Sequence, residues 1–145
     1  MNGKMTVQAQ ALRRLCDEFG IDMLYIFGSR AREVREWLEG TRPALAASAS
    51  DVDVGVCLRR GVTHAVDQRV RMASRLEDLF QAKRVDLVYL FEADPFLAAN
   101  IIRGERVDAR DAYRADVYDL YVLRRAGDLA PLERERMALI LEKNL

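Results

Sequence analysis

Three short apolar segments constrain the fold of this chain most strongly. Residues 22–27 (DMLYIF), 51–58 (DVDVGVCL) and 84–91 (RVDLVYLF) have the length and the β-branched and aromatic content of buried strands. The segments around them repeat apolar residues at helical spacing. These segments are 6–20, 30–39 and 64–82. This alternation of helices and strands predicts an α/β (α+β) domain with a small sheet flanked by helices.

Helices are also expected after the third apolar segment. Residues 94–107 begin with a short helix, because Asp94 can cap its start and Pro95 suits its first position. Two C-terminal helices are predicted at about 112–125 and 131–143, where apolar residues again recur at helical spacing.

The length of 145 residues suits one domain with one hydrophobic core. We therefore predict a single domain over residues 1–145, with its core in about 5–107 and a helical extension in about 110–145. Cys16 and Cys57 each lie in an apolar pattern, so they are predicted to be buried free thiols rather than a disulfide.

Charge and hydropathy exclude several kinds of partner. The 23 Lys and Arg residues balance 23 Asp and Glu residues, so no overall field attracts the chain to nucleic acid. The first ten residues lack the apolar centre of a signal peptide, and no apolar run is long enough to span a bilayer. We predict a cytoplasmic protein with neither a membrane nor nucleic acid as a direct partner.

Carboxylates occupy strand positions where apolar residues would be expected. Asp51 and Asp53 fall on one face of a predicted strand, with Cα atoms roughly 7 Å apart, and Asp86 lies in the next strand. Such close like charges repel each other and are costly to bury unpaired. Mg²⁺ prefers oxygen ligands of this kind, so the three are candidate ligands for two Mg²⁺ ions. They could instead be solvated, or Asp86 could pair with Arg84 or with an arginine of a helix.

A second motif, FGSRAR, joins the end of the first predicted strand to a helix. Gly28 allows a ligand to approach the backbone closely, and Ser29 can donate a hydrogen bond. A helix N-terminus attracts anions, and Arg30 and Arg32 stand nearby. The motif therefore predicts a triphosphate-binding turn, although an ordinary helix cap has the same pattern.

In combination, YIFGSRAR, SDVDVGV and RVDLVYL resemble the nucleotidyltransferase superfamily that includes DNA polymerase beta. Its motif is Gly-Ser followed by Asp-x-Asp, with a third acidic residue on a later strand. The resemblance covers roughly residues 5–107 and implies the nucleotidyltransferase fold, a small mixed sheet flanked by helices, followed here by C-terminal helices.

The resemblance also implies a role for each motif residue. Gly28 and Ser29 would hold the triphosphate of the nucleotide. Asp51 and Asp53 would coordinate both Mg²⁺ ions. Asp86 would bind the catalytic metal and help to deprotonate the attacking hydroxyl.

Within the superfamily, the short chain resembles the minimal nucleotidyltransferases, the MntA-type antitoxins of HEPN–MNT toxin–antitoxin pairs. This implies transfer of AMP from ATP to a tyrosine hydroxyl of a cognate HEPN toxin, which is silenced by the modification. The expected partners are then ATP and that toxin. Two alternatives remain open: an antitoxin that neutralises its toxin by binding alone, and a small-molecule (aminoglycoside-type) nucleotidyltransferase.

Three other features bear on this prediction. Residues 30–50 separate Ser29 from Asp51, about twice the length usual in the family, and could reshape the entry of the acceptor. His64, the only histidine, is predicted to be a solvated residue in the first turn of a helix. The apolar stripe of the last predicted helix either packs on the domain or forms the contact with a partner. This stripe comprises Leu132, Met137, Ile140 and Leu141.

Overall fold

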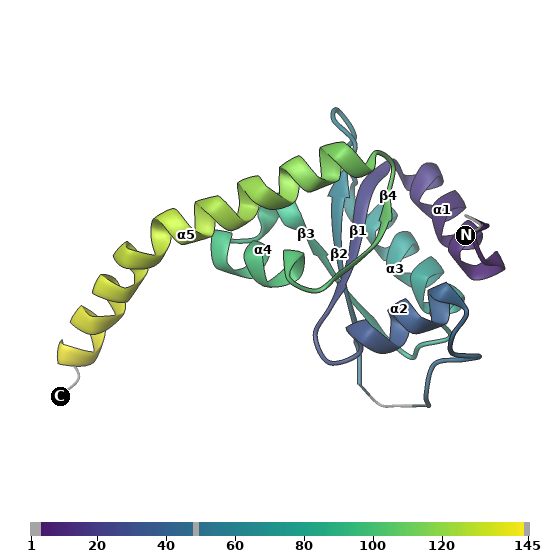
Figure 1. Cartoon of the computed structure of the whole chain (residues 1–145), viewed down its shortest axis with the longest axis horizontal. Helices are drawn as coiled ribbons and strands as arrows, with labels where there is room; N and C mark the ends of the chain where they lie inside the picture. The colour runs from purple at the N-terminus through teal and green to yellow at the C-terminus, as the bar shows by residue number, and fades with distance from the viewer. Residues whose placement is uncertain (1–3, 48–49, 144–145) are drawn as a thin grey trace.

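A mixed sheet lies at the centre of the structure, a computed structural model that describes residues 4–47 and 50–143 (Figure 1). Within these residues the sheet has four strands in the order β3-β2-β1-β4. The strands are β1 (Ile21–Phe27), β2 (Val52–Leu58), β3 (Val85–Tyr89) and β4 (Glu105–Ala109). Strand β1 runs antiparallel to β2 and β4, whereas β2 and β3 are parallel. The predicted mixed sheet and its three strands are confirmed.

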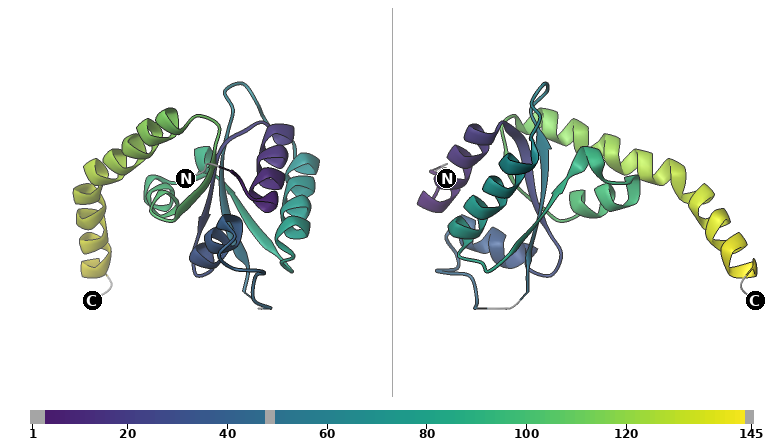
Figure 2. Two further views of the ribbon diagram at one scale, coloured as in Figure 1. Left: turned by 45° about the vertical axis from the view of Figure 1, so that its right-hand side comes forward. Right: turned by 180° about the vertical axis from the view of Figure 1, so that it is seen from behind.

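Three helices cover one face of the sheet, as Figure 2 shows. They are α1 (Val7–Phe19), α2 (Ala31–Glu39) and α3 (Val66–Phe80). Side chains alternate between the two faces of a strand, and Val52, Val54 and Val56 of β2 all point into the core beneath these helices. This face therefore holds the larger hydrophobic core, and the even-numbered residues of β2 build its centre.

The other face is covered by α4 (Pro95–Ile102) and the first half of α5 (Ala112–Lys143), with a short 3-10 helix, η1 (Leu90–Glu92), before α4. Helix α4 lies very close to the sheet, because a Cβ at Gly55 would be only 2.5 Å from Ile101 Cγ2. The buried Tyr25 hydroxyl bonds to Asp119 of α5, and Arg106 of β4 pairs with the same carboxylate at 2.8 Å. These contacts hold the first half of α5 on the domain.

The prediction of two C-terminal helices was wrong, because residues 112–143 form the single helix α5, with Pro131 inside it. Proline removes one helical hydrogen bond and its ring displaces the preceding turn, so a helix can bend there rather than end. Figure 1 shows α5 bending as it leaves the domain. None of the helices in the described part of the chain is both long and apolar enough to cross a membrane.

The distal part of α5, residues 127–143, contains no buried residue. Ala126 is the last buried residue of the helix in the described structure, which ends at residue 143. The four members of the predicted apolar stripe are all exposed, between 39% and 63%. Packing within the chain, one of the two alternatives for this stripe, is therefore not what the structure shows.

The prediction of a solvated His64 was also wrong, because its side chain is buried. Its Nδ1 lies 2.8 Å from the Tyr89 hydroxyl and its Nε2 lies 2.7 Å from the Phe19 carbonyl oxygen. Both nitrogen atoms of the ring thus have hydrogen-bond partners, so burial of the ring leaves no polar atom unsatisfied. The thiols are free as predicted, with Cys16 buried and Cys57 partly buried.

Candidate active site

The strand registers bring the two sequence motifs to the same end of the sheet. In the antiparallel pair β1–β2, Phe27 lies opposite Asp53. In the parallel pair β2–β3, Asp53 lies opposite Asp86. The turn that follows β1, formed by Gly28 and Ser29, therefore lies beside the starts of β2 and β3. Residues far apart in the sequence meet here because β1 ends where the other two strands begin.

Asp53 and Asp86 point to the face that α4 covers, opposite to the valines of β2. Neither carboxylate forms an ion pair with another described residue. Loss of hydration, together with the charges of Asp86 and Asp51, raises the pKa of the Asp53 carboxyl above its ordinary value. The carboxylates thus repel each other in the absence of a cation.

Gly28 makes room for the Asp53 carboxylate. The backbone of Gly28 has a φ of +76°, which side chains other than glycine rarely adopt. A Cβ at this position would also overlap a carboxylate oxygen of Asp53. The glycine therefore serves two purposes, the turn itself and the close approach of the carboxylate.

Asp51 lies at the same sheet end but faces a different partner. Its carboxylate is 3.7 Å from the Arg84 guanidinium, with the arginine side chain exposed and the aspartate partly exposed. No three His, Cys, Asp or Glu side chains among residues 4–47 and 50–143 are gathered closely enough to hold a metal ion. The oxygen donors suit Mg²⁺ in kind, and a shared ion would require Asp51 to turn from Arg84 toward Asp53.

Arg30, a candidate phosphate ligand from the sequence, is buried against the linker between α2 and β2, residues 40–51. Its guanidinium donates to the Glu33 carboxylate at 3.1 and 3.2 Å. It also donates to the carbonyl oxygens of Ala46 at 2.9 Å and Ser50 at 3.1 Å, while Glu33 accepts from the Ala46 N–H. Arg30 therefore holds the linker in place directly before Asp51.

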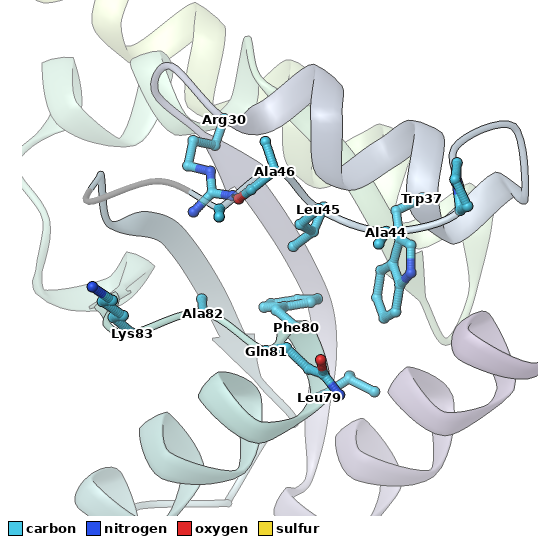
Figure 3. A pocket seen from close by; sticks show the side chains of 12 residues that line it. Arg30, Trp37, Ala44, Leu45, Ala46, Leu79, Phe80, Gln81, Ala82 and Lys83 are labelled. Carbon is cyan, nitrogen blue, oxygen red and sulfur yellow. The ribbon is translucent and has the colours of Figure 1, made fainter.

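A cavity of about 630 Å³ lies between this linker and the end of α3 (Figure 3). Trp37 and Phe80 line it, with their rings packed edge to face at a centroid distance of 5.9 Å. Trp37 is thus a packing residue. Leu45 of the linker packs on the core beneath α1–α3, so the described linker covers the face opposite to Asp53 and Asp86. Residues 48–49 of the long segment between Ser29 and Asp51 lie outside the described residues.

A second cavity, of about 450 Å³, opens at the Gly-Ser turn itself. Gly28, Ser29 and Arg32 line one side, and Asn100 and Arg103 at the end of α4 line the other. No side chain caps the N-terminus of α2 here. The Ala31 N–H donates to the Gly28 carbonyl oxygen at 3.3 Å, so the N–H groups of Arg32 and Glu33 are the ones that can bind an anion. Sequence reasoning missed Asn100 and Arg103, because only the pairing of β4 with β1 brings them to the turn.

The arrangement of a Gly-Ser turn beside strand carboxylates can be compared with known families. The sequence profile of the family described as "Polymerase beta, Nucleotidyltransferase" matches residues 10–112, from α1 to the start of α5. The chain belongs to this nucleotidyltransferase family. No protein of curated function matches the sequence.

Solved structures share the fold of this nucleotidyltransferase. A toxin–antitoxin structure with AMP-PNP aligns with a TM-score of 0.65 and 18% identity, over 94% of this chain and 98% of that chain. A tri-AMPylated Shewanella oneidensis HEPN toxin in complex with an MNT antitoxin gives 0.62 and 17%, over 96% and 98%. A structure described as a minimal nucleotidyltransferase gives 0.50 and 28%, over 68% and 86%.

The site has the two chemical components that nucleotidyl transfer needs. The Gly-Ser turn and the N-terminus of α2 offer hydrogen-bond donors to phosphate oxygens. The carboxylates of β2 and β3 offer oxygen ligands for a divalent cation and an acceptor for a proton. Among the sequence-predicted residues, Gly28, Ser29 and Arg32 line one cavity, and the three aspartates lie at the same end of the sheet. Arg30 instead donates hydrogen bonds to carbonyl oxygens of the linker.

Proposed function

We propose that this nucleotidyltransferase transfers AMP from ATP to a tyrosine hydroxyl of a HEPN-family toxin in a Mg²⁺-dependent reaction and so acts as its antitoxin. The observation that carries the proposal is the strand register, which sets Asp53 opposite Asp86 and against Gly28. That geometry joins an anion-binding turn to carboxylates at a single sheet end. ATP and Mg²⁺ are cytoplasmic solutes, so a cytoplasmic location remains our prediction.

The roles of the residues follow from their positions. Gly28 and Ser29 bind the triphosphate through the backbone of the turn and the serine hydroxyl. Asp51 and Asp53, with Asp86, would hold Mg²⁺, which supplies charge neutralisation for the phosphates and carboxylates. Asp86, the most exposed position of β3, also accepts the proton of the acceptor hydroxyl. The hydroxyl oxygen bonds to the α-phosphorus, the bond from this phosphorus to the bridging oxygen breaks, and pyrophosphate leaves.

Two observations support a protein as the acceptor. The solved relatives with this fold include an MNT antitoxin in complex with an AMPylated HEPN toxin. In this chain the distal part of α5 exposes an apolar stripe that no other described residue covers. Such a stripe is typical of a surface that binds another protein.

The test is transfer of label from ATP labelled at the α-phosphate to the HEPN protein encoded next to this chain. We expect label on the toxin with the parent and none with Asp53→Asn. Asp67→Asn, in the exposed first turn of α3, is the matched control and should behave like the parent. Absence of transfer with the parent, or equal transfer with Asp53→Asn, would contradict the proposal.

The exposed stripe of α5 also favours a second candidate, an antitoxin that neutralises the toxin by binding alone. The two candidates differ in cells that express the toxin. A variant with Asp51→Asn and Asp53→Asn should fail to protect the cells if catalysis is required. It should protect them fully if binding alone neutralises the toxin.

A further inference from the structure

The pairing of β1 with β4 places Arg103 beside the Gly-Ser turn. Ile26 of β1 lies opposite Glu105 of β4 in an antiparallel register. Gly104 continues this close approach, because a Cβ there would lie 2.5 Å from the Ile26 carbonyl oxygen and 3.1 Å from Phe27 Cα. Continuing the same antiparallel register by one more residue sets Gly28, just after β1, beside Arg103, just before β4. Arg103 thus flanks the turn on the side opposite to Asp53.

The charge of Arg103 is not neutralised within the described structure. Its guanidinium forms no ion pair with residues 4–47 or 50–143, although it lines the cavity at the turn. Glu105, the acidic residue of the same cavity, is already paired with Arg35 at 3.1 Å. The second arginine of the cavity, Arg32, has an 82% exposed side chain and a pair with Glu36 at 3.3 Å, which water screens strongly.

Negative and positive side chains therefore lie on opposite sides of Gly28. The carboxylates of β2 and β3 lie on one side of the turn, and the arginine at the end of α4 lies on the other. A nucleotide whose α-phosphate meets the carboxylate side would extend its remaining phosphates across the turn toward Arg103. A guanidinium can bind phosphate with two charge-assisted hydrogen bonds. It therefore suits the β- and γ-phosphates of the nucleotide, where negative charge accumulates when pyrophosphate leaves.

We propose that Arg103 binds the β- and γ-phosphates of the nucleotide and stabilises the departing pyrophosphate. This inference rests on the proposed nucleotidyl transfer and adds a ligand that lies outside the Gly-Ser and Asp-x-Asp motifs. Asn100, one helical turn before Arg103 on α4, lines the same cavity and provides an uncharged donor to these phosphates.

The test compares the binding of ATP and of AMP to the full chain, measured by calorimetry in the presence of Mg²⁺. Arg103→Met should weaken ATP binding about tenfold or more, the range of a charge-assisted contact. It should leave AMP binding within about twofold, because AMP lacks the two phosphates that Arg103 contacts. Arg103→Lys should recover part of the loss. Arg110→Met, an exposed arginine just beyond β4, is the control and should bind ATP like the parent.

The outcomes separate this inference from the proposed function. If the parent binds ATP and Arg103→Met binds it equally well, or loses ATP and AMP binding to the same degree, the role of Arg103 is wrong and nucleotidyl transfer stands. If the parent itself binds no ATP, both proposals are overturned. Thermal unfolding without ligand should give the same midpoint for Arg103→Met and the parent, since the side chain is exposed.

Discussion

Gly28 and Asp53 constrain each other at the end of β1. The glycine was predicted from the sequence as a place where a ligand can approach the backbone. The structure shows that the Asp53 carboxylate occupies part of that space, because a Cβ at Gly28 would overlap it. The absence of a side chain at Gly28 therefore permits both the turn and the close approach of the Asp53 carboxylate.

Gly28→Ala should lower the free energy of unfolding by more than a left-handed backbone alone requires, which is about 1–2 kcal/mol. The extra loss comes from displacement of Asp53. Gly61→Ala is the matched control, because Gly61 also has a positive φ, of +85°, but nothing lies within 4 Å of its Cβ position. Urea unfolding of both variants measures the difference.

A double-mutant cycle isolates the contact between the two side-chain positions. In an Asp53→Ala background the overlap is absent, so Gly28→Ala should cost no more than Gly61→Ala. If Gly28→Ala and Gly61→Ala cost the same in the parent background, the contact between Gly28 and Asp53 has no energetic consequence and this account of the turn is wrong.

The raised pKa of Asp53 predicts a stability that depends on pH. A folded-state pKa above the unfolded value means that ionisation of Asp53 costs stability. This cost is fully present above the folded-state pKa and disappears as the pH falls below the ordinary value of 3.8. In a chelating buffer, Asp53→Asn should therefore melt at a higher temperature than the parent at pH 7, by a margin that shrinks toward pH 4.

Addition of Mg²⁺ provides the complementary measurement. A cation that binds the folded state raises its melting temperature, so Mg²⁺ should stabilise the parent at pH 7 and have little effect on Asp53→Asn. A variant that melts below the parent in chelator, or that responds equally to Mg²⁺, would show that Asp53 is not a strained carboxylate at a cation site.

At the scale of elements, apolar content decided what could be predicted. The strands β1, β2 and β3 are apolar runs and were found from the sequence. Strand β4 was missed because three of its five residues are charged, and their partners come from distant segments: Arg35 for Glu105, Asp119 for Arg106 and Arg13 for Asp108. Helix α5 was divided at Pro131, where the chain bends rather than stops.

The same limit applies to the site. Gly28, Ser29 and the aspartates stand out in the sequence because they interrupt apolar strands or start a helix. The sequence did not show which arginines face the Gly-Ser turn and which stabilise other parts of the fold. Arg30 is committed to Glu33 and to linker carbonyl groups, and Arg103 reaches the turn only through β4. Both facts depend on packing between segments that are far apart in the sequence.

Arg30→Met and Arg32→Met should therefore act differently, the first on stability and the second on the use of ATP. Arg30→Met removes a buried guanidinium, leaves the partly buried Glu33 carboxylate without its cation, and should cost about 3 kcal/mol of unfolding free energy. Arg32→Met removes an exposed pair, so it should leave stability unchanged and raise KM for ATP. Urea unfolding and steady-state kinetics measure the two effects, and equal losses of stability would contradict the assignment.

At the scale of the whole molecule, α5 extends well beyond the layers of the domain, as both views in Figure 2 show. Its first half is anchored by Tyr25 and Arg106 through Asp119. Beyond Ala126 the described helix has no buried residue. The molecule thus combines a packed α/β domain with a helical arm whose apolar residues are exposed in the described structure.

Removal of residues 131–145 should leave the domain intact, because none of the described residues in that range is buried. The urea midpoint and the affinity for ATP should equal those of the full chain. Complex formation with the HEPN toxin, measured by gel filtration, should be lost, and transfer of AMP to it should fall with it. A shortened chain that modifies the toxin at the parental rate would contradict the role of the arm.

The most direct test of the central claim is a crystal structure of the protein with AMP-PNP and Mn²⁺, which replaces Mg²⁺ and can be located by its anomalous scattering. The account predicts Mn²⁺ bound by the carboxylates of Asp53 and Asp86, with the phosphates over Gly28 and Ser29. A nucleotide seated instead in the cavity beside Trp37 and Phe80, with no Mn²⁺ between the two carboxylates, would contradict it.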